Sequence, residues 1–201
     1  HGTTDYSNKH EKSAALSQVK GHPLQTFTRE NEALTKLIDR MKELLHDTDE
    51  TTGSGSLQAD EKQTDTENLP QIAALLLKIR EVAVHYAKKG DLLYPHLNAR
   101  YGIAGPSAVM WTADDEIRDE LGALCKALQK GRETAEQRAT ESKGKETAEQ
   151  NVTGSFQSPQ GDVKWLERLQ KVLLRAEEMI YKENHILFPN CAVNFTEEDW
   201  M

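Results

Sequence analysis

Four segments of the chain repeat their apolar residues with the period of an α-helix, and this pattern constrains the fold most. The segments span residues 23–46, 70–89, 107–130 and 163–187. Each is about 20–25 residues long, or roughly 30–37 Å at 1.5 Å per residue. Their apolar residues form one stripe per helix, which has to be buried against other helices. No segment has the alternating pattern of a strand, so we predict an all-α fold, an up-down-up-down four-helix bundle.

Two polar segments separate the predicted helices. Residues 47–69 and 130–162 hold few apolar side chains, which helps to explain why only 37% of the chain is hydrophobic. Such segments cannot bury enough apolar surface to offset the entropy of ordering them. We therefore predict two long flexible insertions within one bundle domain that spans residues 22–201. Residues 1–21 are expected to be a linker that follows an N-terminal domain missing from this chain.

Composition and charge exclude several classes of protein. Two cysteines cannot form the disulfide framework of a small secreted fold. No apolar run approaches the ~18–20 residues that a membrane helix needs, and the N-terminus does not have the pattern of a signal peptide. The net charge of −8, without a basic patch, argues against nucleic acid or an acidic membrane as partner. We predict a cytoplasmic protein.

The sequence around His85 is repeated near the end of the chain. Residues 85–95 align without a gap with residues 179–189, and both copies close a long predicted helix. The identical positions are Lys88, Leu93 and Pro95, which match Lys182, Leu187 and Pro189. Tyr94 also matches Phe188. We therefore predict two helical hairpins, each ending in this motif.

Titratable residues lie at one end of the predicted bundle. In an up-down-up-down bundle, the starts of the first and third helices lie beside the ends of the second and fourth. Buried carboxylates and imidazoles are costly unless they are paired or bind a metal, and bundle proteins use such side chains to hold iron or manganese. The candidate metal ligands at this end are His22, His85, Asp114 and Glu183, and Glu30 can join them.

Each candidate also has an interpretation that involves no metal. His22 can cap the first helix, and Asp114 in a first turn is favoured by the helix dipole alone. Glu183 can be a surface carboxylate, and His85 can be a hydrogen-bonded residue at the edge of its stripe. The pattern by itself leaves both interpretations open.

Four stretches of the chain resemble hemerythrin-like (HHE, cation-binding) domains. They begin Gly21-His-Pro-Leu, His85-Tyr, Val109-Met-Trp and Lys182-Glu. More narrowly, they resemble a bacterial subfamily in which this domain follows a short helical domain and often precedes a PAS sensor domain. The resemblance implies an up-down four-helix bundle with a non-haem, usually di-iron, site at one end. It also implies that His22 and His85 occupy histidine ligand positions and that Glu183 occupies a glutamate ligand position.

The chain departs from the family's pattern at three ligand positions. Lys89 and Gly90 stand where a glutamate is implied, four or five residues after His85. Asp114 and Met179 stand where histidines are implied. A single ion or an empty pocket therefore agrees with the remaining ligands at least as well as an iron pair.

Three functions remain open from the sequence. The first is a non-enzymatic metal-binding module that holds iron, or else zinc or manganese, and reports oxygen, nitric oxide or redox state to a signalling partner or within a homodimer. The second is a metal-free bundle that acts as a regulatory or interaction scaffold. The third is an enzyme that uses the same pocket, such as a di-iron oxidase.

Overall fold

Helices make up all the regular structure in the part of the chain that the computed structural model describes, residues 6–50, 68–103, 105–142 and 162–200. In chain order they are α1 (Tyr6–Ser17), α2 (Pro23–Glu50), α3 (Leu69–Arg80), α4 (Val82–Lys88), η1 (Lys89–Leu93), α5 (Tyr94–Tyr101), α6 (Gly105–Ser142), α7 (Asp162–Lys182), η2 (Glu183–Leu187), α8 (Phe188–Asn194) and η3 (Glu198–Trp200). The elements η1 and η2 are π-helices, and η3 is a 3-10 helix. None of the described helices is long and apolar enough to cross a membrane.

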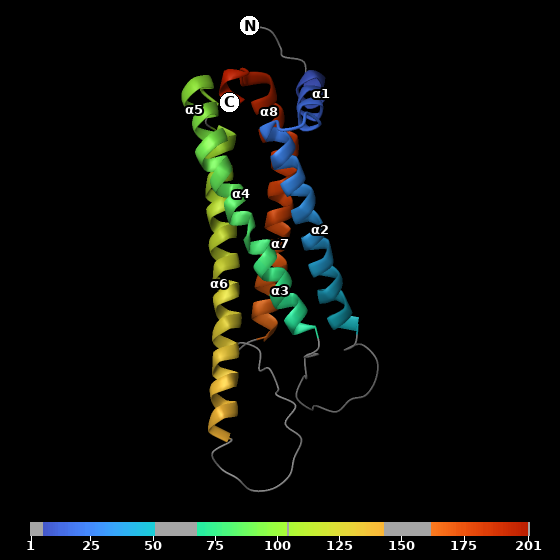
Figure 1. Ribbon diagram of the computed structural model, residues 1–201, viewed down its shortest axis with the longest axis vertical. Helices are drawn as coiled ribbons and strands as arrows, with labels where there is room; N and C mark the ends of the chain where they lie inside the picture. The colour runs from blue at the N-terminus through green and yellow to red at the C-terminus, as the bar shows by residue number, and fades with distance from the viewer. Residues whose placement is uncertain (1–5, 51–67, 104, 143–161, 201) are drawn as a thin grey trace.

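Four long helical stretches lie side by side, and each runs antiparallel to its neighbours (Figure 1). α2 contacts α3 and α7, and α6 contacts the same two helices, so the contacts close into a ring. The predicted all-α, up-down-up-down bundle is therefore confirmed. Its core consists of the apolar stripes of these helices, with fully buried side chains such as Ile38, Met41, Leu76, Ile79, Ile117, Leu121, Leu124, Leu169 and Leu173.

The second and fourth helical stretches continue beyond their predicted ends. The second continues past Pro95 through α5, and the fourth continues past Pro189 through α8. The prediction that the fourth helix spans residues 163–187, and so ends before Pro189, is therefore wrong. Each proline lies in the first turn of the helix that contains it, where the missing N–H of proline costs little.

Each of these prolines directly follows a π-helical turn. The backbone N–H of Tyr94 donates to the carbonyl of Lys89, and that of Phe188 donates to the carbonyl of Glu183. Both bonds span five residues instead of the four of an α-helix. The repeated motif of the sequence therefore forms the same unusual backbone twice.

Some residues predicted to be linker or insertion are helical. Residues 6–17 form α1, which packs against α8, and Lys9 Nζ donates to Asn190 Oδ1 at 3.2 Å. α2 extends to Glu50 and α6 to Ser142, so both are longer than predicted. Most of the remaining linker and insertion residues lie outside the described residues. They are residues 1–5, 51–67 and 143–161.

Candidate functional site

Three of the four predicted metal ligands meet in one buried cluster. His85 on α4, Asp114 on α6 and Glu183 at the start of η2 are 5%, 4% and 0% exposed. A fourth residue, Lys89 at the start of η1, is 0% exposed and joins the two carboxylates. Its Nζ lies 2.9 Å from Asp114 Oδ1 and also contacts Glu183 Oε1. We call His85, Lys89, Asp114 and Glu183 the buried charge cluster.

The helical register explains why Lys89 points into the bundle. It follows Tyr86 by three residues and His85 by four, and residues at these spacings share one face of a helix. Both neighbours are buried, so Lys89 lies on the buried face. Glu183 has the same relation to Met179, which is 1% exposed and four residues earlier. The first residues of the two π-helices therefore meet inside the bundle.

Glu183 is the anionic centre of the cluster. Its Oε2 accepts hydrogen bonds from Asn31 Nδ2 at 2.7 Å and from His85 Nε2 at 2.9 Å, while Oε1 accepts from Lys89. Burial alone would raise the pKa of Glu183, but the charges of Lys89 and His85 and their hydrogen bonds outweigh burial and hold this pKa below its usual value. Each carboxylate oxygen thus has a donor from the chain itself.

Asp114 is paired on both of its oxygens. Oδ1 faces Lys89, and Oδ2 accepts a hydrogen bond from the hydroxyl of Tyr94 at 2.7 Å. Burial raises the pKa of Asp114 above its usual value, although Lys89 and Tyr94 act in the opposite direction. Burial and the nearby charge of Asp114 also raise the pKa of Tyr94, so its hydroxyl keeps the proton that it donates.

His85 lies between two carboxylates. Nδ1 is 2.8 Å from Glu30 Oε2, and Nε2 is 2.9 Å from Glu183 Oε2. Burial raises the pKa of Glu30, but hydrogen bonds from Lys88 and His85 bring it below its usual value. Both carboxylates are therefore acceptors, and each ring nitrogen of His85 faces one of them.

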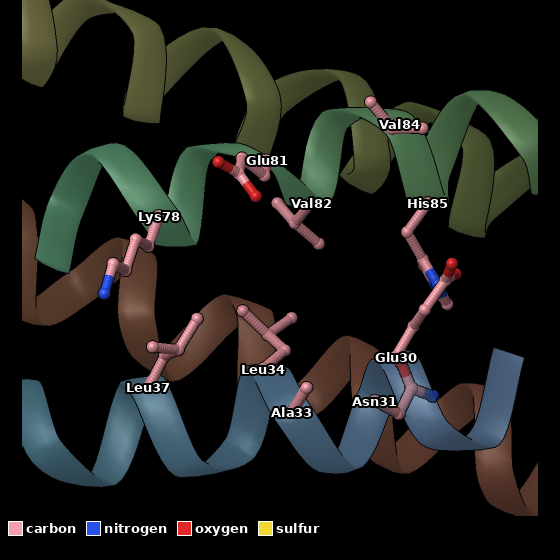
Figure 2. A pocket seen from close by; sticks show the side chains of 10 residues that line it. All are labelled: Glu30, Asn31, Ala33, Leu34, Leu37, Lys78, Glu81, Val82, Val84 and His85. Atoms are coloured by element: carbon pink, nitrogen blue, oxygen red, sulfur yellow. The ribbon is translucent and has the colours of Figure 1, made fainter. Parts of the chain in front are cut away.

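A pocket of about 400 Å³ lies beside this histidine, between α2 and the α3–α4 stretch. Figure 2 shows Glu30 and His85 pointing toward one another at one end of it. The rest of the lining is mostly apolar and includes Leu34, Leu37 and Val82. Of the four residues of the buried charge cluster, only His85 lines this pocket.

His22, the fourth predicted ligand, has different partners. Its Nδ1 accepts the backbone N–H of Leu24 at 3.1 Å, so it caps the start of α2. Its ring packs on Trp200, with 4.6 Å between the centroids, and burial lowers the pKa of His22. Within the described residues, no hydrogen bond or ion pair joins His22 to the buried charge cluster. These contacts agree with the capping interpretation, and a role as metal ligand stays a prediction.

Sequence reasoning missed the central position of Lys89. It treated this lysine only as a departure from the implied glutamate. A usable signal was present, because Lys89 falls on the apolar stripe of its helix, where a lysine needs a buried anion as partner. Two further donors to the carboxylates were also missed: Asn31, and Tyr94, which the sequence showed only as a position of the repeat.

The side chains as arranged do not fit a metal ion. Among the described residues, no three or more His, Cys, Asp or Glu side chains are placed so that they could hold one. A metal-binding histidine needs a free ring nitrogen, whereas each ring nitrogen of His85 lies within hydrogen-bond distance of a carboxylate. The ammonium of Lys89 stands between Asp114 and Glu183, where a divalent ion would meet its repulsion. An iron pair, which needs more ligands still, fits this cluster least.

A family model matches most of the chain. The model is described as the hemerythrin HHE cation binding domain, and it matches residues 22–191, which include the whole buried charge cluster. No curated protein and no solved structure matches the chain. The match confirms the resemblance seen in the sequence, and it suggests metal binding. The narrower resemblance to a bacterial subfamily with a PAS domain stays a prediction.

Proposed function

The chain belongs to the hemerythrin HHE cation-binding domain family, and we propose that it is a non-enzymatic regulatory or interaction module that works without a bound metal ion. One observation carries this proposal: the chain itself supplies the cation at the buried centre. Lys89 contacts both Asp114 and Glu183, and the other oxygens of these carboxylates accept hydrogen bonds from other side chains.

The burial of the cluster supports a structural role over a catalytic one. Its four residues are at most 5% exposed, so a substrate has no direct access to Lys89, Asp114 or Glu183. Paired buried charges can specify one arrangement of helices, because any other arrangement leaves a charge unpaired. In this proposal, the charge cluster fixes the end of the bundle, and a signalling partner or a second copy of the chain recognises that fixed surface.

A second candidate is a sensory module that holds one metal ion. It is favoured by the family match and by the convergence of His85, Asp114 and Glu183, which are suitable donor types for iron, zinc or manganese. Such a module would report oxygen, nitric oxide or redox state to a partner. It requires that Lys89 leave its present position between the carboxylates.

Metal analysis distinguishes the two candidates. The full chain is purified without a chelating tag, in air and without oxygen, and its iron, zinc and manganese are measured. We expect less than about a tenth of an equivalent of each, because no open set of deprotonated ligands is present. About one equivalent of metal would overturn the metal-free function if His85→Ala and Glu183→Ala both lowered it. His96→Ala is the matched control, because His96 contacts Phe195 outside the cluster.

A further inference from the structure

We propose that Lys89 is a built-in cation, which holds Asp114 and Glu183 together and excludes divalent metal ions from the buried charge cluster. The inference rests on the proposed metal-free function and names the residue that enforces it. It concerns the Nζ atom of Lys89, which contacts one oxygen of each carboxylate.

The charges of the cluster require a cation at this position. Two buried carboxylates that share one site repel each other, and a buried ammonium is costly unless it is paired. Lys89 is 0% exposed and Glu183 is 0% exposed, so water does little to screen either of them. Each group therefore needs the other, and one ammonium serves both Asp114 and Glu183.

The surroundings of the ammonium suit a lysine and not a metal ion. Lys89 Nζ lies 4.3 Å from the ring centroid of Tyr86 and 5.9 Å from that of Tyr94. An aromatic face attracts an ammonium, but it offers no lone pair to a metal. The hydroxyl of Tyr86 is buried without a hydrogen-bond partner among the described residues, so Tyr86 contacts the ammonium through its ring and not through its hydroxyl. Structural metal sites need about four ligand atoms.

Covalent attachment makes the exclusion effective. Lys89 opens η1, directly opposite Glu183 at the start of η2. A tethered group competes at a high effective concentration, whereas a metal ion competes at its free concentration in solution. A metal ion must therefore displace an ammonium that never diffuses away.

Two substitutions of Lys89 test the inference. Lys89→Met removes the charge but keeps much of the side chain's length, and Lys89→Glu adds a third carboxylate beside Asp114 and Glu183. Melting temperature is measured with and without manganese(II) chloride, and bound manganese is measured after gel filtration. We expect both variants to melt below the wild type without metal. Manganese should raise the melting temperature of both variants and leave the wild type unchanged. Lys89→Glu should retain about one equivalent of manganese.

Lys88 provides the matched controls. Its ammonium contacts Glu30 at a half-buried position outside the cluster. Lys88→Met and Lys88→Glu should respond to manganese as the wild type does. The double variant Lys89→Met/Asp114→Asn removes one carboxylate with the ammonium, so we expect it to melt above Lys89→Met and to bind no manganese.

Each outcome bears on a different claim. If neither Lys89 variant gains manganese or thermal stability from it, the inference is wrong, and a metal-free wild type would leave the proposed function intact. A wild type that already carries an equivalent of metal, which His85→Ala and Glu183→Ala both lower, overturns the proposed function itself. If a Lys89 variant folds only when manganese is present, that dependence supports the inference. A Lys89 single variant can also fail to fold both with and without manganese. If the double variant Lys89→Met/Asp114→Asn then folds and binds manganese, the inference is also wrong.

Discussion

The two π-helices η1 and η2 have equivalent places in the repeat and the same backbone, yet they begin with opposite charges. Each is five residues long, and each is followed by an aromatic residue and a proline. Lys89 opens η1, Glu183 opens η2, and the two side chains contact each other inside the bundle. The comparison teaches that the same backbone geometry, formed twice, presents a cation in one copy and an anion in the other, and that these two side chains pair.

The surroundings of the two π-helices differ as well. Glu183 accepts from three donors, which are Asn31, His85 and Lys89. Lys89 has two carboxylate partners and the ring of Tyr86. The anionic half of the pair therefore depends on convergent hydrogen bonds, and the cationic half depends more on its aromatic neighbour. Substitutions that remove or exchange these features show which half stabilises the bundle more.

Glu183→Ala should have the largest effect. It leaves the buried ammonium of Lys89 and the ring of His85 without their shared partner, so we expect the free energy of unfolding to fall by about 3–5 kcal/mol. Urea unfolding followed by circular dichroism at neutral pH measures the loss. Glu178→Ala, at an exposed carboxylate in the last turns of α7, should change stability by less than about 0.5 kcal/mol. Equal losses in the two variants would show that apolar packing alone holds η2 in place.

Exchange of the two charges tests whether η1 and η2 are equivalent. The double variant Lys89→Glu/Glu183→Lys keeps an ion pair, but it places a carboxylate beside Asp114 and an ammonium beside His85. We expect the double variant to recover part of the loss seen in the two single variants, with a coupling of about 0.5–3 kcal/mol, and to remain less stable than the wild type. The measurement is a double-mutant cycle in urea. A double variant as stable as the wild type would mean that the surroundings do not distinguish the two positions.

Tyr94→Phe makes the aromatic residue after η1 the same as Phe188 after η2. It removes the hydroxyl that donates to Asp114 Oδ2 and leaves that buried oxygen without its donor. We expect a loss of about 1–3 kcal/mol in the free energy of unfolding. Tyr86→Phe is the matched control, because the Tyr86 hydroxyl has no partner among the described residues, and its removal should cost nothing. A similar loss in both variants would contradict this account of Asp114.

Gly90→Ala should have the smallest effect. Gly90 is the second residue of η1, where η2 has Asn184. Its φ is not positive, and an added Cβ would lie 3.9 Å from Trp111 Cζ2, an ordinary contact. Because alanine restricts the unfolded chain, we expect a gain of about 0.4–1 kcal/mol, measured by thermal unfolding. A loss of stability would show that η1, unlike η2, needs the freedom of glycine.

The sequence predicted the bundle because its signal is local and repeated. Apolar stripes of four helices determine which faces are buried, and antiparallel order then determines which helix ends meet. This reasoning brought His85, Asp114 and Glu183 to one end of the molecule, where the structure also places them. The two polar segments did not obscure the helical period, because they lie between the periodic stretches and do not interrupt them.

The sequence could not predict the two π-helices or the partner of Lys89. A π-turn differs from an α-turn by one hydrogen-bond register, and the 3.6-residue period continues on both sides of it. The pairing of Lys89 with Glu183 joins residues that are far apart in the chain, so only their contact in three dimensions reveals it. His22 shows the reverse case, because a position that matches a ligand pattern has its own local partner in the backbone of Leu24.

The two π-helices also constrain the number of residues in the chain around them, as strongly as the cluster constrains which residues stand there. A π-turn takes one residue more than an α-turn, and one residue corresponds to about 100° of rotation about a helix axis. Leu97 in α5, and Cys191 and Ala192 in α8, are buried only at the rotation that follows these turns. Deletion of a single residue from η1 or η2 would turn these apolar side chains away from the core. Gains and losses of residues should therefore be far less tolerated here than in a surface loop.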